Sequence, residues 1–193
     1  MEKRDEDIMM EYRSGGEPES IKIIFIRYKA RILNFCLRML GNRADAEDVT
    51  GDVFLTLFSG KYAYDPEAKF STWLFTVARN NCISRIRKRR NLVSIWFSSK
   101  GSDEYEQWDV EDHEDQAAEQ LSKREAASRV RRAIRLLPDE QREAIILREY
   151  QRLSYDEIRQ ILDCSKEKVK ILIFRGREGL REELKSFIEE ETQ

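Results

Sequence analysis

Apolar residues recur at intervals of three and four along most of this sequence, and few residues interrupt the pattern. Between residues 23 and 40 the spacing predicts one apolar stripe along a single helix. The stripe consists of Ile23, Ile26, Ala30, Leu33, Leu37 and Leu40. Only three prolines and eight glycines, the residues that most often break helices, occur among 193 residues. The pattern therefore predicts an all-α fold.

Turn and capping residues divide the first ninety residues into helices. Gly41 and Asn42 suit the end of the first helix, and a second helix is expected from about Ala44. Its apolar positions are Val49, Val53, Phe54 and Leu57. A loop containing Gly60 and Pro66 follows. A third helix is expected to begin near Ser71 as its N-cap and to run to Arg90.

The last third of the chain predicts four more helices. Their apolar positions are Leu121, Val130, Ile134 and Leu137; then Ala144, Ile145 and Leu147; then Ile158, Ile161 and Leu162; and finally a stripe within Ser165–Arg181. Pro138 suits the first turn of the second of these helices. Ser154 and Glu157 form the pattern of a capping box at the start of the third.

The last two of these helices have the spacing of a helix-turn-helix, the usual DNA-reading unit. On a wheel of about 100° per residue, one side of the final helix is a normal core stripe of Val169, Leu172, Ile173, Gly176 and Leu180. The other side mixes Lys166, Lys170, Arg175 and Arg177 with Ile171 and Phe174. Three explanations stay open for the two apolar residues: Ile171 touches a thymine methyl group in DNA, both face a protein, or the helix is buried on more sides.

Residues 91–120 differ from the rest, because they contain nine acidic residues and one basic residue. This segment has no helical stripe, and we expect an extended or disordered acidic linker. Trp96, Phe97 and Trp108 are unusual in it and would dock either on a neighbouring domain or on a partner. The net charge of −2 hides this contrast between a strongly acidic segment and two mildly basic ones.

Cysteine usage and the N-terminus limit the class of protein. Cys36, Cys82 and Cys164 are odd in number and widely spaced, which favours small buried side chains over disulfides or zinc, with a redox role as the alternative. No apolar run approaches the ~18 residues of a membrane span. The acidic start of the sequence does not suit a signal peptide. We therefore expect a cytoplasmic protein without membrane insertion.

The segment FSTWLFTVARNNCISRIRKRR, residues 70–90, combines aromatic residues with cations. Trp73, Asn80 and Arg87 follow at seven-residue steps and share one helical face. Aromatic rings that stack on bases, with cations along the backbone, are typical of single-stranded nucleic-acid binding. Core packing is the alternative for Trp73, and a solvated helix end is the alternative for the basic run.

With these motifs the chain resembles bacterial RNA polymerase sigma factors of the extracytoplasmic-function group. The matching stretches are NRADAEDVTGDVFLTLF, KFSTWLFTVARN, LLPDEQREAIILREYQRLSYDEIRQIL and VKILIFRGREGLR, in the family's order. The resemblance implies two helical domains, residues 1–90 like sigma region 2 and residues 121–193 like region 4, with 91–120 as the linker. It also implies a protein that is not an enzyme, has no cofactor, metal or catalytic residue, and works with core RNA polymerase, promoter DNA and an anti-sigma factor.

The resemblance also assigns roles to residues. Those implied at the −10 element, where the loop 61–70 would trap a flipped base, are Lys61, Tyr64, Lys69, Phe70, Trp73, Asn80, Arg85, Arg87 and Lys88. Those implied at the −35 element are Lys166, Lys168, Lys170, Ile171 and Arg175. Those implied to face polymerase are Asp45, Glu47, Asp48 and Asp52. The linker would thread the polymerase's RNA-exit path.

Two positions depart from the family pattern. Ile171-Leu172 stands where many members have Ser-Arg, and Arg159 stands where many have alanine. The first departure removes a phosphate-binding cation, and the second puts a long side chain where two helices approach closely.

Three rival functions remain on sequence grounds. Asp45, Asp48 and Asp52 share one helical face and could bind a divalent metal in a nuclease or phosphatase. The helix-turn-helix could belong to a transcriptional regulator that acts without polymerase. The third rival is an interaction module whose contact surface includes Ile171 and Phe174.

Overall fold

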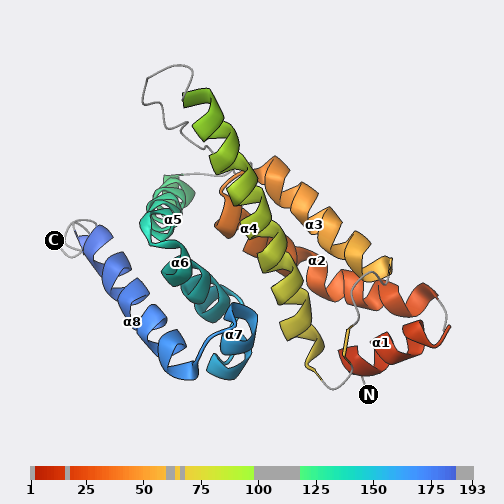
Figure 1. Cartoon of the computed structure of the whole chain (residues 1–193). Coiled ribbons are helices and arrows are strands. Elements are labelled where there is room, and N and C mark those ends of the chain that lie inside the picture. Colours follow the sequence, from red (N-terminus) through yellow and green to blue (C-terminus); the bar gives the residue numbers. More distant parts are fainter. Residues whose placement is uncertain (1–2, 16–17, 60–63, 66–67, 98–117, 186–193) are drawn as a thin grey trace. The chain divides into compact units, whose positions relative to one another are not determined.

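The computed structural model describes residues 3–15, 18–59, 64–65, 68–97 and 118–185, and all regular structure in these ranges is helical (Figure 1). Contacts divide the chain into two compact units, Met1–Asp109 and Val110–Gln193. The all-α expectation is confirmed. None of the helices in the described ranges is long and apolar enough to cross a membrane.

Unit 1 is built around α2 (Pro18–Leu40), which contacts α1 (Asp5–Arg13), α3 (Arg43–Phe58) and α4 (Phe70–Phe97). Its core contains Ile24, Ile32, Phe35 and Met39 from α2, with Val49, Val53, Phe54 and Leu57 from α3 and Leu74, Phe75 and Ala78 from α4. The predicted apolar positions of α3 are confirmed. Helix α1 was not predicted from the sequence, because its many acidic residues obscure the apolar pattern. Its side chains Ile8 and Met9 are nonetheless buried.

The stripe predicted on α2 is wrong by one or two residues. Ile26 is 77% exposed and Ile23 is 39% exposed, whereas Ile24, Tyr28 and Ile32 are buried. Apolar residues cover so much of α2 that two neighbouring stripes fit a 3.6-residue period equally well. The aromatic and cysteine side chains decide between them, because Tyr28, Phe35 and Cys36 all lie on the buried face.

Caps define the starts of α3 and α4. Gly41 has a φ of 71°, as expected after a helix end, and the Asn42 side chain accepts a hydrogen bond from the Asp45 N–H at 2.9 Å. Ser71 was predicted as the N-cap of α4, but this prediction is wrong, since the helix already begins at Phe70. The Phe70 N–H donates instead to Oε1 of Glu6 in α1 at 3.0 Å.

Helix α4 continues to Phe97 rather than ending at Arg90. The first seven residues of the expected linker, 91–97, are therefore helical, and so are residues 118–120 at its other end. Residues 98–117, including Trp108, lie outside the described residues. Of Trp96 and Phe97 the structure describes the helical backbone alone, so the docking of these three aromatic residues stays open.

Unit 2 consists of α5 (Ala118–Leu136), α6 (Asp139–Ile145), the π-helical turn η1 (Ile146–Tyr150), α7 (Tyr155–Leu162) and α8 (Lys166–Glu183). Pro138 directly precedes α6, one position before the predicted first turn. The capping box at the start of α7 is confirmed: Ser154 accepts from the Glu157 N–H and its own N–H donates to the Glu157 carboxylate. Asp163 ends α7 with a φ of 51°, which starts the short turn into α8.

The three cysteines are free thiols. Cys36 and Cys82 are fully buried and pack as small apolar side chains, as expected, whereas Cys164 is partly exposed in the turn between α7 and α8.

Candidate nucleic-acid interfaces

The outer face of α8 carries two large exposed apolar side chains. Val169, Leu172 and Ile173 are buried against the rest of unit 2, while Ile171 is 50% and Phe174 is 66% exposed. Ser165 caps the helix by accepting from the Lys168 N–H at 3.1 Å. The explanation that α8 is buried on further sides is therefore wrong for the described residues. The outer face is available to DNA or to a protein.

Three cations of α8 are held by acids on other elements of unit 2. Lys166 pairs with Asp156 at 2.7 Å, Lys168 with Glu140 at 2.8 Å, and Arg177 with Glu149 at 2.6 Å. The Lys166 hydrogen bond lowers the pKa of Asp156, and the Glu140 hydrogen bond raises the pKa of Lys168. Both partners of each pair are largely solvated, so exchange for other ligands costs little.

Lys170 and Arg175 differ from these three cations. Both are exposed, and neither forms a hydrogen bond or ion pair with a residue that the structure describes. They flank Ile171 and Phe174 on the outer face of α8. Of the five residues predicted at the −35 element, Lys170, Ile171 and Arg175 are therefore accessible without breaking a contact within the described residues.

The two departures from the family pattern have little effect on the packing of unit 2. Leu172 is 8% exposed and belongs to the core, where an arginine would need a way out to solvent. Arg159 lies on the exposed side of α7 and donates to Asp156 at 3.3 Å. It therefore does not lie between the two helices.

An aromatic cluster forms the start of α4. The ring of Phe70 lies 5.5 Å from that of Tyr28, 5.4 Å from Tyr64 and 5.8 Å from Trp73, measured between centroids. Tyr64 and Phe70 are buried, whereas Trp73 is partly exposed. In this arrangement Tyr64 and Phe70 shape the loop before α4, and Trp73 is the ring of the three that reaches solvent. Lys61 lies outside the described residues.

Hydrogen bonds fix the described part of this loop. The Tyr64 hydroxyl donates to the Ala68 carbonyl at 2.6 Å, and Arg13 of α1 donates to the Tyr64 carbonyl at 2.5 Å. Burial raises the pKa of Tyr64 to about 12. The loop and α1 therefore hold each other in place at the start of α4.

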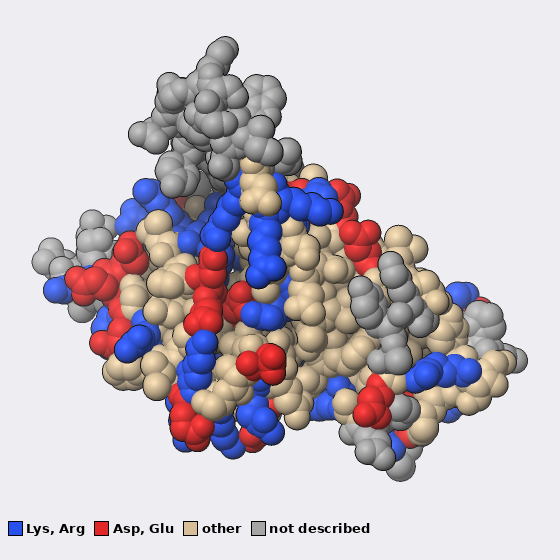
Figure 2. Space-filling model, in the orientation of Figure 1, with Lys and Arg blue, Asp and Glu red and all other residues tan. Residues whose placement is uncertain are grey.

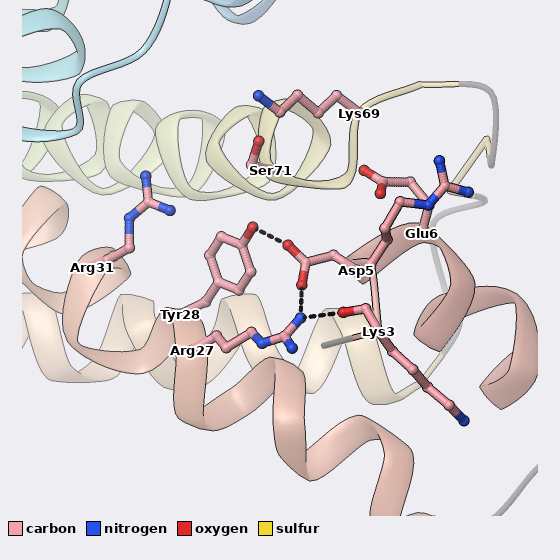
Figure 3. A pocket seen from close by; sticks show the side chains of 9 residues that line it. Lys3, Asp5, Glu6, Arg27, Tyr28, Arg31, Lys69 and Ser71 are labelled. Atoms are coloured by element: carbon pink, nitrogen blue, oxygen red, sulfur yellow. Dashed lines mark hydrogen bonds and ion pairs between the residues drawn. The ribbon is translucent and has the colours of Figure 1, made fainter. Parts of the chain in front are cut away.

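A polar hollow of about 510 Å³ lies beside this loop (Figure 3). Asp5 lies on one side of it, accepting from Arg27 and from the Tyr28 hydroxyl, both at 2.5 Å. Lys69 and Ser71 from the start of α4 lie on the other side, as Figure 3 shows. Its full lining is Lys3, Arg4, Asp5, Glu6, Arg27, Tyr28, Arg31, Lys69 and Ser71. Sequence reasoning missed this hollow, since the four residues 3–6, at and just before the unpredicted start of α1, supply much of its wall.

The second half of α4 carries cations next to the acidic start of α3, which Figure 2 shows as blue and red side chains close together. Arg85 donates to Asp45 Oδ1 at 2.5 Å and to Asp48 Oδ2 at 3.1 Å. The Asp45 hydrogen bond raises the pKa of Arg85. Thus a residue predicted to contact DNA is bonded to two residues predicted to contact polymerase.

The neighbours of this ion pair are more accessible. Asn80, Arg87 and Lys88 are exposed on α4. On α3, Glu47 pairs with Arg43 at 2.9 Å. Asp52 is exposed and forms no hydrogen bond or ion pair with a described residue.

Exposed apolar side chains accompany the acids on the outer side of α2 and α3. Leu55 is 65% exposed one turn after Asp52, and α2 adds the exposed Ile23 and Ile26. Sequence reasoning missed this surface because it assigned the two isoleucines to the core. The metal hypothesis for Asp45, Asp48 and Asp52 finds no support, since no group of three metal-binding side chains occurs among the described residues.

Comparison with known proteins agrees with this arrangement. The family described as Sigma-70 region 2 matches residues 24–92, and the family described as Sigma-70, region 4 matches residues 127–180. The ECF RNA polymerase sigma factor SigW of Bacillus subtilis (strain 168) is 34% identical over 173 residues, which cover 88% of this chain and 91% of SigW. The ECF RNA polymerase sigma-E factor of Escherichia coli (strain K12) is 24% identical over 188 residues, or 97% of this chain and 98% of that protein.

Solved structures share the fold. The sigma factor RpoE from Bartonella quintana, in complex with the anti-sigma factor NepR, has a TM-score of 0.70 and 25% identity, over 86% of this chain and 98% of that one. CnrH, in complex with the cytosolic domain of CnrY, has a TM-score of 0.69 and 21% identity, over 94% of this chain and 97% of that one. The second likeness shows the fold alone.

Two helical units, one with an aromatic cluster and exposed cations on α4 and one with a helix-turn-helix, have the features of a DNA-binding transcription factor. The chain belongs to the sigma-70 family of RNA polymerase sigma factors, in its extracytoplasmic-function group. It acts with RNA polymerase in promoter-specific initiation of transcription, and a regulator that works without polymerase is not favoured.

Proposed function

We propose that this sigma factor binds core RNA polymerase in the cytoplasm and reads two promoter elements, the −10 element with unit 1 and the −35 element with α8. It contributes promoter specificity and no catalytic step of its own. The observation that carries this proposal is the outer face of α8, where accessible cations flank two exposed apolar side chains.

At the −35 element, α8 enters the major groove with its N-terminal half. Lys170 and Arg175 contact phosphates, and Ile171 contacts a thymine methyl group, the apolar feature of that groove. Lys166 and Lys168 exchange their carboxylate partners for phosphates as the helix approaches DNA. Because Ile171 makes an apolar contact with one base, Ile171→Ser changes the preferred −35 sequence more than the total affinity.

At the −10 element, the loop before α4 and the cations after Asn80 hold the separated strand. Trp73 is the ring available for stacking, while Tyr64 and Phe70 keep the loop in shape. The polar hollow beside Lys69 and Ser71 offers both donors and acceptors to an unpaired nucleotide. A preformed site of this kind offsets the few kcal/mol that unstacking a base costs.

Polymerase binds the outer side of α3. Asp52, Asp48 and Leu55 lie along it at helical spacing, so charge and apolar area alternate on one accessible face. A mixed surface of this kind is typical of a stable protein interface. The relative RpoE from Bartonella quintana was solved in complex with the anti-sigma factor NepR. By that likeness we also propose an anti-sigma factor as a partner.

Run-off transcription with purified core polymerase and genomic fragments tests this function. We expect specific transcripts when the full chain is added, and weak DNA binding by the chain alone. Specific DNA binding without polymerase would favour the plain regulator, and tight protein binding without transcripts would favour the interaction module.

Leu55→Lys is a sharper probe of the polymerase surface. It places a cation on an exposed position of α3 and should weaken core binding while the protein stays folded. Ile26→Lys makes the same kind of change at an exposed position of α2 and serves as a second probe of this surface. Unchanged core affinity for both variants would contradict the proposed surface.

A further inference from the structure

One acidic side chain lies on the face of α8 that the proposed function directs into DNA. Glu167 is exposed in the first turn, and by 100° per residue it lies within about 60° of both Ile171 and Phe174. Glu167 forms no hydrogen bond or ion pair with any residue that the structure describes. Glu140 and Asp156 of the neighbouring helices differ, since each is bonded to one of the lysines of α8.

A carboxylate in this position must find a donor when α8 approaches DNA. Phosphates repel it, and burying an ionised carboxylate without a partner is costly. In the major groove the exposed donors are the amino groups of cytosine and adenine. Adenine presents the N7 acceptor beside its amino group, which repels a second acceptor, whereas cytosine presents a donor alone. An acceptor-only side chain therefore favours cytosine.

The position of Glu167 on the helix indicates where this base lies. Glu167 is one helical turn before Ile171, or about 6 Å along the axis. Base pairs are about 3.4 Å apart, so the two side chains reach base pairs that are one or two steps apart.

We propose that Glu167 is a specificity-determining residue that selects a C·G pair in the −35 element, one or two steps from a thymine that Ile171 contacts. The inference rests on the proposed function, because it takes α8 as the helix in the groove. A helix-dipole role in the first turn is the structural alternative, since an acid there is favourable in any helix.

The test is run-off transcription by the full chain with core polymerase on a promoter library that is randomised across the −35 element. We expect the wild type to require cytosine at one position. Glu167→Gln should reduce that preference about tenfold and move it toward adenine, because glutamine offers both a donor and an acceptor to adenine.

Two further variants separate base reading from helix stability. Glu167→Asp keeps the charge at the helix start but shortens the reach by one methylene group, so it should also lose the cytosine preference. Glu178→Gln is the control, because Glu178 lies on the same side of α8 about three turns later and pairs with Arg181. It should leave the preferred sequence unchanged.

The possible outcomes distinguish failure of this inference from failure of the proposed function on which it rests. Transcripts whose cytosine preference survives in both Glu167 variants would overturn the inference and leave the proposed function intact. An equal loss of transcription from all −35 sequences, together with a lower melting temperature of the variant, would show that Glu167 acts through the helix dipole. That result would also overturn the inference. No promoter-specific transcript from the wild type would overturn the proposed function, and the inference with it.

Discussion

Gly176 lies where α8 approaches α6 within unit 2. A Cβ atom at this position would lie 2.6 Å from Ile145 Cγ1 and 3.1 Å from Ile145 Cδ1. Ile145 is 1% exposed, so its branched side chain has little room to move. The helices therefore approach this closely because residue 176 has no side chain.

Gly176→Ala should destabilise unit 2, because overpacking of a filled core costs about 1–3 kcal/mol and exceeds the gain in helix propensity. Gly51→Ala is the matched control. Gly51 also lies inside a helix, but nothing lies within 4 Å of an added Cβ atom. That change should stabilise unit 1 by roughly 0.5–1 kcal/mol. Urea unfolding of both variants measures the difference, and equal shifts of the same sign would contradict this explanation.

Two tyrosines make the stability of unit 1 depend on alkaline pH. Burial and the hydrogen bond to Asp5 raise the pKa of Tyr28, and burial raises the pKa of Tyr64 to about 12. In the unfolded chain both phenols ionise near pH 10. Their stabilisation is therefore complete below pH 10 and is lost as the pH rises from 10 toward 12.

Urea unfolding between pH 8 and 11 checks this dependence. We expect the free energy of unfolding to fall above pH 10 in the wild type. In Tyr28→Phe the fall should be smaller, although the variant starts lower at pH 8 because Asp5 loses a donor. A slope equal to that of the wild type would rule out Tyr28 as a cause.

At the scale of elements, local signals were enough to predict most helices and their ends. Ser154 with Glu157 and the break at Gly41 are short-range patterns, and the structure confirms both. The buried stripe of α8 was also predictable, because the few apolar residues that fit a helical period define a single narrow face. The helical wheel placed Ile171 and Phe174 outside this stripe but left their burial open, and the structure shows that both are exposed.

Contacts between distant residues could not be predicted in this way. Glu6 caps α4 from 64 residues away, and Arg85 reaches Asp45 across 40 residues. No local spacing marks either pair. The buried face of α2 was missed for another reason, since its apolar residues allow two faces and α1, which helps to choose between them, was not predicted.

The ion pairs between α8 and its neighbours lead to a prediction about affinity. In the proposed −35 contact Glu140 competes with DNA phosphates for Lys168, because both are anions that bind the same ammonium group. Glu140→Gln should therefore raise the affinity of the polymerase-bound chain for its promoter, by less than about fivefold since the pair is solvated. It should also steepen the dependence on salt by about one released ion.

Glu125→Gln is the control for this prediction. It changes the net charge equally but lies exposed on α5 and has no hydrogen-bond or ion-pair partner among the described residues. Filter-binding measurements at several salt concentrations compare the two variants. Equal gains in affinity would show that the effect is only the removed charge.

At the scale of the whole molecule, the proposed function depends on two units, each of which we expect to bind DNA weakly by itself. Within each unit acids hold part of the cations, since Arg85, Lys166 and Lys168 each pair with a carboxylate of their own unit. Polymerase raises the effective concentration of one unit at its element once the other is bound. Without polymerase, the presence of both units therefore adds little to the affinity of the chain for DNA.

Promoter spacing checks this dependence on a fixed distance. Inserting five base pairs between the −35 and −10 elements turns one element about half a helical turn from the other. We expect initiation to fall to the level of a promoter without a −35 element. Changing the sequence of the spacer at constant length should have little effect. Full activity after the insertion would mean that the two units act independently.

The Glu6 cap has a practical meaning for work with this protein. The first backbone amide of α4, beside the loop proposed to hold the separated strand, is satisfied by the Glu6 carboxylate of α1. Displacing α1, whether by a neighbouring insertion or by a partner protein, would leave that amide without its acceptor and disturb the start of α4. Any loss of promoter opening caused by a change in α1 should therefore first be traced to this cap.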